Sequence, residues 1–209
     1  MAGRFADEKA DFHPRSWLSR YRRTSIGYLT KMLLFYHGIG IGLLLAGSPI
    51  IEQAIPDYQE PDIPRSLFGV LAAGPFEETL FFGIPFYAFG NAYLVLATGL
   101  IWAGTHIFNT TTFEINSLAF GNMLFVFPSL FFSLRTWVSG KGWFAVATHS
   151  AWNGMFFAAG CSTGEFQCTA IDSDISTTVF SVALSAVLIA ATYALYKRRE
   201  NKERQRLAA

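Results

Sequence analysis

Residues 67–89, LFGVLAAGPFEETLFFGIPFYAF, decide the fold class of this chain. The stretch is long and apolar enough to cross a membrane, which takes about 20 residues in a helix. It nevertheless carries two adjacent carboxylates, Glu77 and Glu78. An acid at the centre of a spanning helix costs about 2.5 to 3.5 kcal/mol, so ionisable residues inside a membrane are candidates for function. The stretch therefore predicts a membrane helix that contributes to a buried site.

The composition of the whole chain also indicates a membrane protein. Of its 209 residues, 52% are hydrophobic and only 15% are charged, whereas a soluble domain carries about 25% charged residues. The net charge of +1 gives no electrostatic reason to expect a nucleic-acid partner, so membrane lipids are the expected surroundings. Residues 1–25 are too polar to resemble a cleaved signal peptide and are expected to lie on the cytoplasmic surface.

Six apolar stretches predict an all-α fold, a polytopic membrane helix bundle. The sequence contains no repeat and no low-complexity stretch, so we expect residues 1–209 to form a single transmembrane domain. Within it, residues 67–159 carry the motifs discussed below, and residues 197–209 form a basic tail. The expected helices are 26–51, 67–89, 92–108, 118–138, 143–159 and 177–196.

The distribution of charge predicts that both termini are cytoplasmic, because loops rich in Lys and Arg stay on that side. The basic residues gather before the first helix, between the fourth and the fifth, and after the last. They include Arg15, Arg20, Arg22, Arg23, Arg135, Lys141, Lys197, Arg198, Arg199, Lys202, Arg204 and Arg206. The opposite loops carry Glu52, Asp57, Glu60, Asp62, Glu114, Glu165, Asp172 and Asp174, with Arg65 as their one basic residue.

The two cysteines, Cys161 and Cys168, both fall in the last external loop of this topology. In an oxidising compartment they would form a short disulfide ring. Two unpaired thiols are equally compatible with the sequence. Their spacing is not that of a zinc ribbon, which needs a second pair of Cys or His residues nearby.

Three polar elements on different helices indicate a shared buried site. Adjacent helical residues point about 100° apart, so Glu77 and Glu78 cannot face one cavity equally. We expect one of them to be catalytic and the other to support it. The other two elements each place two side chains four residues apart, on one helical face: Trp102 with His106, and His149 with Asn153.

Each histidine also has a purely structural explanation. A single histidine inside a membrane is more often a hydrogen-bonded packing residue than a catalytic one. We give this interpretation to His37, which has no acidic or amide companion at helical spacing. For His106 and His149, the order of the three elements along the chain favours a functional site.

This order resembles the CAAX-protease and bacteriocin-processing family of intramembrane proteases. The family motifs read Glu-Glu-x-x-x-Arg, Phe-x-x-x-His, and His-x-x-x-Asn or Asp, each on its own membrane helix. The resemblance covers residues 67–159, four of the six expected helices. Phe82 stands where the family has Arg, which removes a charge that would partner a carboxylate and leaves open a degenerate or differently tuned site. Trp102 stands where the family has Phe and keeps an aromatic ring.

The resemblance implies hydrolysis of a peptide bond within or near the bilayer. By it, Glu77 would activate a water held by His106, and His149 with Asn153 would stabilise the oxyanion. Fixed hydrogen-bond donors in a water-poor site are well suited to this task. Glu78 and Trp102 would support the site. The substrate would be a prenylated C-terminal peptide, a bacteriocin leader or another membrane-associated peptide.

The resemblance leaves the cofactor and the activity open. Glu77, His106 and His149 could supply a zinc shell with an open position for water, although we favour catalysis without a permanently bound metal. Phe82 raises the alternative of a non-catalytic immunity or interaction protein. A small transporter or proton relay would also use intramembrane Glu and His, but the internal repeat of many transporters is missing here.

Reporter fusions test the predicted topology. A reporter after residue 209 is expected on the cytoplasmic side and a reporter inserted within residues 160–176 on the opposite side, because one membrane helix separates them. A fusion ahead of residue 26 serves as the control and should match the C-terminal fusion. If the first two reporters lie on the same side, the number of membrane helices is wrong.

Overall fold

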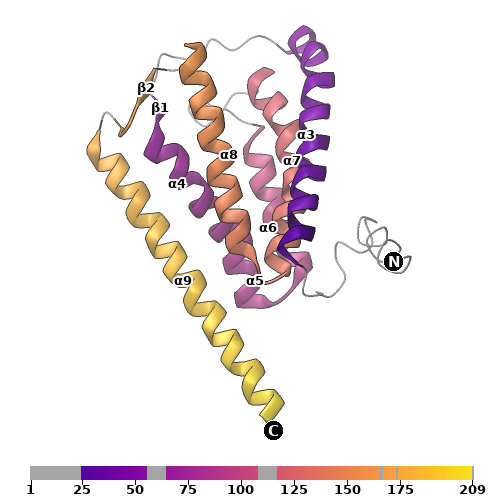
Figure 1. The fold of residues 1–209 in the computed structure, drawn as a ribbon, viewed down its shortest axis with the longest axis vertical. Helices are drawn as coiled ribbons and strands as arrows, with labels where there is room; N and C mark the ends of the chain where they lie inside the picture. The colour runs from indigo at the N-terminus through magenta and orange to yellow at the C-terminus, as the bar shows by residue number, and fades with distance from the viewer. Residues whose placement is uncertain (1–24, 56–64, 108–116, 165–166, 173, 209) are drawn as a thin grey trace. The chain divides into compact units, whose positions relative to one another are not determined.

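The computed structural model of the chain describes residues 25–55, 65–107, 117–164, 167–172 and 174–208, which are predominantly helical (Figure 1). The expected all-α fold is confirmed, because the described residues form six helical segments when α4, η1 and α5 are taken as one helix. The helices are α3 (Ile26–Ala54), α4 (Leu67–Glu78), the π-helical turn η1 (Thr79–Gly83), α5 (Ile84–Phe89), α6 (Ala92–Thr105), α7 (Ser117–Val138), α8 (Gly142–Thr163) and α9 (Ile175–Ala208). The strands are β1 (Arg65–Ser66) and β2 (Cys168–Thr169).

Most helix ends lie within a few residues of the prediction, with two differences. Helix α9 does not end with its apolar stretch but continues through the basic tail to Ala208. Helix α6 ends at Thr105, so His106 is its C-terminal capping residue. Several predicted features lie outside the described residues: the segment 1–24, the end of the third helix at residue 108, and the loop residues Asp57, Glu60, Asp62, Glu114 and Glu165.

Three segments of the described chain have the length and apolar character of membrane spans: Ile26–Ile51, Leu67–Phe89 and Ile175–Arg206. The helix Ala92–Thr105 is apolar but shorter. Large apolar side chains such as Leu34, Leu45 and Phe180 are exposed on the spans, as expected where lipid is the solvent. These features support the predicted integral membrane location. The six crossings and the cytoplasmic termini stay predictions.

The chain divides into two compact units, each assembled from segments that are far apart in sequence. The first unit contains α3, α6 and α7, and α7 packs against both other helices. Gly40 lets α3 and α7 approach closely, since a Cβ there would stand 2.9 Å from the Phe125 carbonyl oxygen. Membrane helices commonly use small residues at such contacts. The single domain expected over residues 1–209 stays a prediction.

The second unit contains β1, α4, η1, α5, α8, β2 and α9. Helix α4 packs on α8 and α9, and η1 and α5 continue along α9. The strands β1 and β2 pair in parallel at the amino end of α4 (Figure 1), with Ser66 opposite Thr169. Ser66 then starts α4 by accepting a hydrogen bond from the Gly69 N–H at 2.9 Å.

Local contacts also define the end of α5 and the start of α9 in the second unit. Helix α5 stops at Gly90, whose φ of 66° is left-handed. Arg199 of α9 donates to the Phe86 carbonyl at 2.9 Å and lies over the Phe86 ring. Before α9, the Asp174 carboxylate accepts hydrogen bonds from the Ser176 hydroxyl and backbone N–H, which hold its pKa below the usual range.

A disulfide joins Cys161, in the last turns of α8, to Cys168 in β2, with Cα atoms 5.8 Å apart. Because β2 pairs with β1 directly before α4, the disulfide and the strand pair together tie the end of α8 to the start of α4. The second unit is therefore closed at this end by one covalent bond and a short ladder.

Replacing Cys161 and Cys168 together by Ser is expected to lower the thermal stability of the purified protein. The bridge closes a loop with a sequence separation of seven, and a loop of this size contributes about 2 kcal/mol. Mass spectrometry of non-reduced protein should first show the two cysteine peptides linked. Two free thiols in protein purified under oxidising conditions would contradict the bridge.

Candidate active site

Glu77 and Glu78 are the last residues of α4, directly before the π-helical turn η1. In this turn the Ile84 N–H bonds to the Thr79 carbonyl, five residues earlier. The Thr79 hydroxyl bonds back to the Pro75 carbonyl at 2.6 Å. Such turns are rare in proteins, and those that occur often lie at functional sites. Nothing in the sequence pattern indicated this turn.

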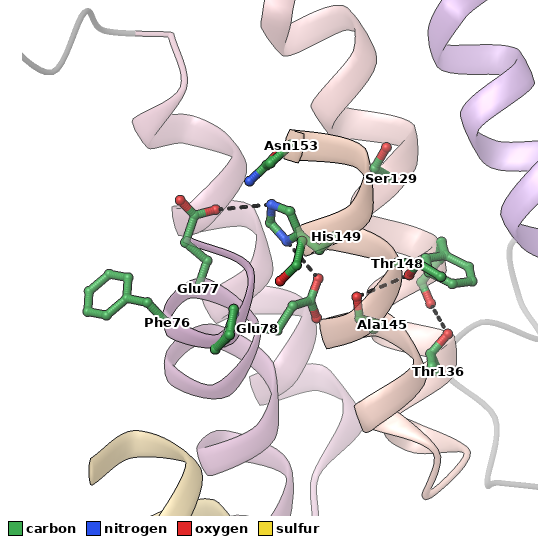
Figure 2. Close-up of polar contacts among 12 residues, drawn as sticks. Phe76, Glu77, Glu78, Ser129, Thr136, Ala145, Thr148, His149 and Asn153 are labelled. Atoms are coloured by element: carbon green, nitrogen blue, oxygen red, sulfur yellow. Dashed lines mark hydrogen bonds and ion pairs between the residues drawn. The ribbon is translucent and has the colours of Figure 1, made fainter. Parts of the chain in front are cut away.

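The two carboxylates approach opposite nitrogens of the His149 imidazole (Figure 2). Glu78 Oε1 lies 3.2 Å from Nδ1, and Glu77 Oε2 lies 3.7 Å from Nε2. Their environments differ, because the Glu78 side chain is 2% exposed and the Glu77 side chain 22%. Glu78 therefore meets the ring from its buried side, and Glu77 meets it from the more open side.

The contact with Glu78 holds the His149 ring in one orientation. At 3.2 Å, either Nδ1–H donates to an ionised carboxylate or a protonated Glu78 donates to Nδ1. In both cases Nε2 is directed toward Glu77. The 3.7 Å between Nε2 and the Glu77 oxygen exceeds hydrogen-bond length, so this contact is electrostatic.

Asn153 follows His149 by one turn of α8, and Figure 2 shows its side chain on the same side of the helix. Its Nδ2 donates a long hydrogen bond of 3.4 Å to the Val70 carbonyl of α4. The structure thus brings Glu77, Glu78, His149 and Asn153 together within one compact unit, from the two helices α4 and α8.

His106 and Trp102 belong to the other unit, at the end of α6. Their rings are in contact, with centroids 5.0 Å apart, as expected for residues four apart on one face. His106 Nδ1 lies 2.9 Å from the Trp102 carbonyl oxygen. A carbonyl only accepts, so Nδ1 carries the proton, and Nε2 is the basic nitrogen of the neutral ring. That His106 reaches the water beside Glu77 stays a prediction.

His37 has the packing role that the sequence suggested. Its ring contacts the rings of Phe125 and Phe132 edge to face, with centroids 5.3 and 5.6 Å away. Edge-to-face contacts of this kind are typical of aromatic cores. His37 is therefore explained by the packing of α3 on α7.

The described residues include no group of three His, Cys, Asp or Glu side chains placed to hold a metal ion. Glu77 and Glu78 do not form such a group with His149, because the two carboxylates meet different nitrogens of one ring. An ion can be ligated by only one of these nitrogens at a time. The zinc shell of Glu77, His106 and His149 that the sequence permits stays a prediction, because His106 belongs to the other unit.

Phe82, which replaces the family Arg, is completely buried. It lies four residues after Glu78, which would be about one turn in an α-helix, but the intervening turn is π-helical. One partner of Glu78 is the imidazole of His149, whose Nδ1 lies 3.2 Å from Glu78 Oε1.

Sequence reasoning missed Ser150, whose hydroxyl donates to the Leu71 carbonyl at 3.0 Å. The signal that could have found it is Pro75. A proline inside a helix has no N–H for the carbonyl four residues earlier, so that carbonyl needs another donor. In this chain the carbonyl is that of Leu71.

All three motifs lie in one matched range. Residues 59–155 match the family described as Type II CAAX prenyl endopeptidase Rce1-like. This range of the sequence is therefore similar to an Rce1-like domain. The match confirms the resemblance to CAAX proteases and supports an intramembrane protease-like function for the chain. Neither the curated proteins nor the solved structures include a match to this chain.

The unequal burial of the two carboxylates predicts unequal effects on stability. Glu78→Met should lower the free energy of unfolding by about 1 to 3 kcal/mol, because it removes the buried acceptor that meets His149 Nδ1. Glu77→Met, the matched control, should have a smaller effect, since Glu77 is partly exposed and makes the longer contact. Thermal unfolding in detergent compares the two. A larger loss in Glu77→Met would contradict the described site.

Proposed function

We propose that this protein is an intramembrane endopeptidase that hydrolyses a peptide bond of a membrane-associated substrate with a water activated by Glu77. The observation that carries the proposal is the His149 imidazole between Glu77 and Glu78, with Asn153 one turn further on. The similarity to an Rce1-like domain supports the reaction class. Prenylated C-terminal peptides are the substrate class that the family description suggests.

In this proposal Glu77 is the general base, because it is the more exposed of the two carboxylates. It takes a proton from water, and the resulting hydroxide attacks the scissile carbonyl carbon. Glu77 then returns the proton to the leaving amine. His106, through Nε2, would accept a hydrogen bond from the attacking water. A correctly placed general base contributes about 10²- to 10⁴-fold to the rate.

The oxyanion is assigned to His149 and Asn153. When the ring is protonated and Glu78 accepts from Nδ1–H, Nε2–H is directed to the side of Glu77, where the oxyanion would form. The Asn153 amide, now on the Val70 carbonyl at 3.4 Å, would supply a second donor. Because the bond to Val70 is long, little is lost when the amide turns to the oxyanion. Glu78 acts through His149 and does not touch the substrate.

The same groups would also suit a proton relay, because carboxylate, imidazole and carboxylate form a continuous row. A proton flux through liposomes carrying the protein, in the absence of peptide cleavage, would favour that function. The non-catalytic alternative, which Phe82 motivates, predicts neither cleavage nor flux.

Cleavage of a farnesylated peptide in proteoliposomes tests the proposed roles. Glu77→Gln should lower kcat by about 10² or more, because it removes the general base. Glu78→Gln should only reduce the rate, because the amide oxygen still accepts from His149 Nδ1. Glu200→Gln is the control for this exchange, since Glu200 pairs with Lys197 and Arg204 in the tail. The unprenylated peptide tests the substrate class.

Two results would contradict this assignment. If Glu78→Gln is the more damaging substitution in an active enzyme, the roles of the two carboxylates are reversed. If the unmodified protein cleaves none of a set of prenylated and unprenylated membrane peptides, and Glu77→Gln does not differ from it, the non-catalytic alternative holds.

A further inference from the structure

Helix α4 continues through Pro75 although the proline removes a helical hydrogen bond. Pro75 has no N–H for the Leu71 carbonyl, and a proline ring presses against the carbonyl four residues earlier. Three consecutive carbonyls at this point accept hydrogen bonds from side chains of other helices. They are Val70 from Asn153 Nδ2 at 3.4 Å, Leu71 from Ser150 Oγ at 3.0 Å, and Ala72 from Ser185 Oγ at 3.3 Å.

Of these three bonds, the bond from Ser150 is the shortest, and it serves the carbonyl that Pro75 deprives of its helical donor. Ser150 also directly follows His149, and Pro75 lies two residues before Glu77. The bond therefore joins α8 to α4 within about two turns of both motifs. In the α-helical pattern the donor for this carbonyl would be the N–H of residue 75, which proline lacks.

The two backbones are close at this contact because residue 74 is a glycine. A Cβ at Gly74 would collide with Ser150 Oγ and would stand 2.8 Å from the Ser150 backbone nitrogen. Only a residue without a side chain allows this approach, so the Ser150 hydroxyl reaches Leu71 from a fixed position on α8. Gly74, Pro75 and Ser150 therefore act as one contact.

We propose that Ser150 is a positioning residue for the site. By donating to the Leu71 carbonyl that Pro75 leaves without a helical donor, it sets the register of α4 on α8 that places Glu78 against His149 Nδ1 and Glu77 beside Nε2. Its effect on catalysis rests on the proposed function, whereas its effect on the imidazole does not. A displacement of about 1 Å in such a site can cost about 10² in rate.

The test is a rescue experiment. Ser150→Ala should lower kcat on the farnesylated peptide by roughly tenfold or more, with little change in KM, since the hydroxyl does not touch the substrate. Pro75→Ala restores an N–H for the Leu71 carbonyl, so adding it to Ser150→Ala should recover most of the lost kcat. Ser162→Ala is the matched control on α8, because the Ser162 hydroxyl donates within its own helix, to the Ala159 carbonyl.

A second readout does not depend on proteolysis. The chain has four histidines, so ¹⁵N-histidine labelling gives few signals, and the His149 signals are those lost in His149→Gln. Ser150→Ala should shift the His149 Nδ1 resonance, and the double variant should return it toward its original position. Gly74→Ala, which pushes α8 away with the serine intact, should reproduce the shift even if Ser150→Ala does not fold.

Unchanged kcat and an unchanged Nδ1 resonance in Ser150→Ala would overturn the inference. Loss without recovery in the double variant would also overturn it, because the hydroxyl would then act elsewhere than on the Leu71 carbonyl. If the unmodified protein cleaves no peptide but the resonance shifts and returns as expected, the proposed function fails while the positioning role of Ser150 stands.

Discussion

The hydrogen bond between Glu78 and His149 is the constraint on which the second unit depends. A carboxylate with almost no exposure is costly to bury unless a specific partner meets it, and here the partner comes from another helix. The bond therefore requires α4 and α8 to lie close together and in one register. Gly74 allows the backbones of α4 and α8 to lie close together. The side chains that bond to the carbonyls beside Pro75 set the register of the two helices.

The same contact bears on the departure from the family pattern at Phe82. In the family pattern a cation one turn further on would partner the second carboxylate, whereas here that position is apolar and buried. Here Glu78 contacts the imidazole of His149, which is itself a motif residue. Losing the Arg therefore leaves Glu78 with a partner and ties its position directly to that of His149.

Much of the helical architecture could be predicted from the length of the apolar stretches. A continuous helical segment runs from residue 67 to residue 89, as expected. A single stretch in lipid can satisfy its backbone hydrogen bonds internally only as a helix. Helix α9 was underestimated because apolar length limits a membrane span but not a helix, and its basic tail has good helix formers. The strands β1 and β2 have two residues each, too few to show any periodicity.

The candidate site was only partly predictable for a different reason. Motif order pointed to Glu77, His149 and Asn153, but spacing along one helix cannot say which atom of another helix a side chain meets. The contact of Glu78 with Nδ1 and the bond from Ser150 to Leu71 both join residues more than 70 positions apart. The π-helical turn further changes the position of Phe82 relative to Glu78 from that in a regular α-helix.

The segment from β1 to Gly90 is held by contacts with other segments at both ends and has two irregular positions between them. At the first end β1 pairs with β2, which the disulfide joins to Cys161 of α8. At the other end Arg199 donates a hydrogen bond to the Phe86 carbonyl. The irregular positions are Pro75 and the π-helical turn, and the two carboxylates lie between them. The chain on both sides of Glu77 and Glu78 is therefore held by contacts with other segments of the second unit, on one side by β2 and on the other by α9.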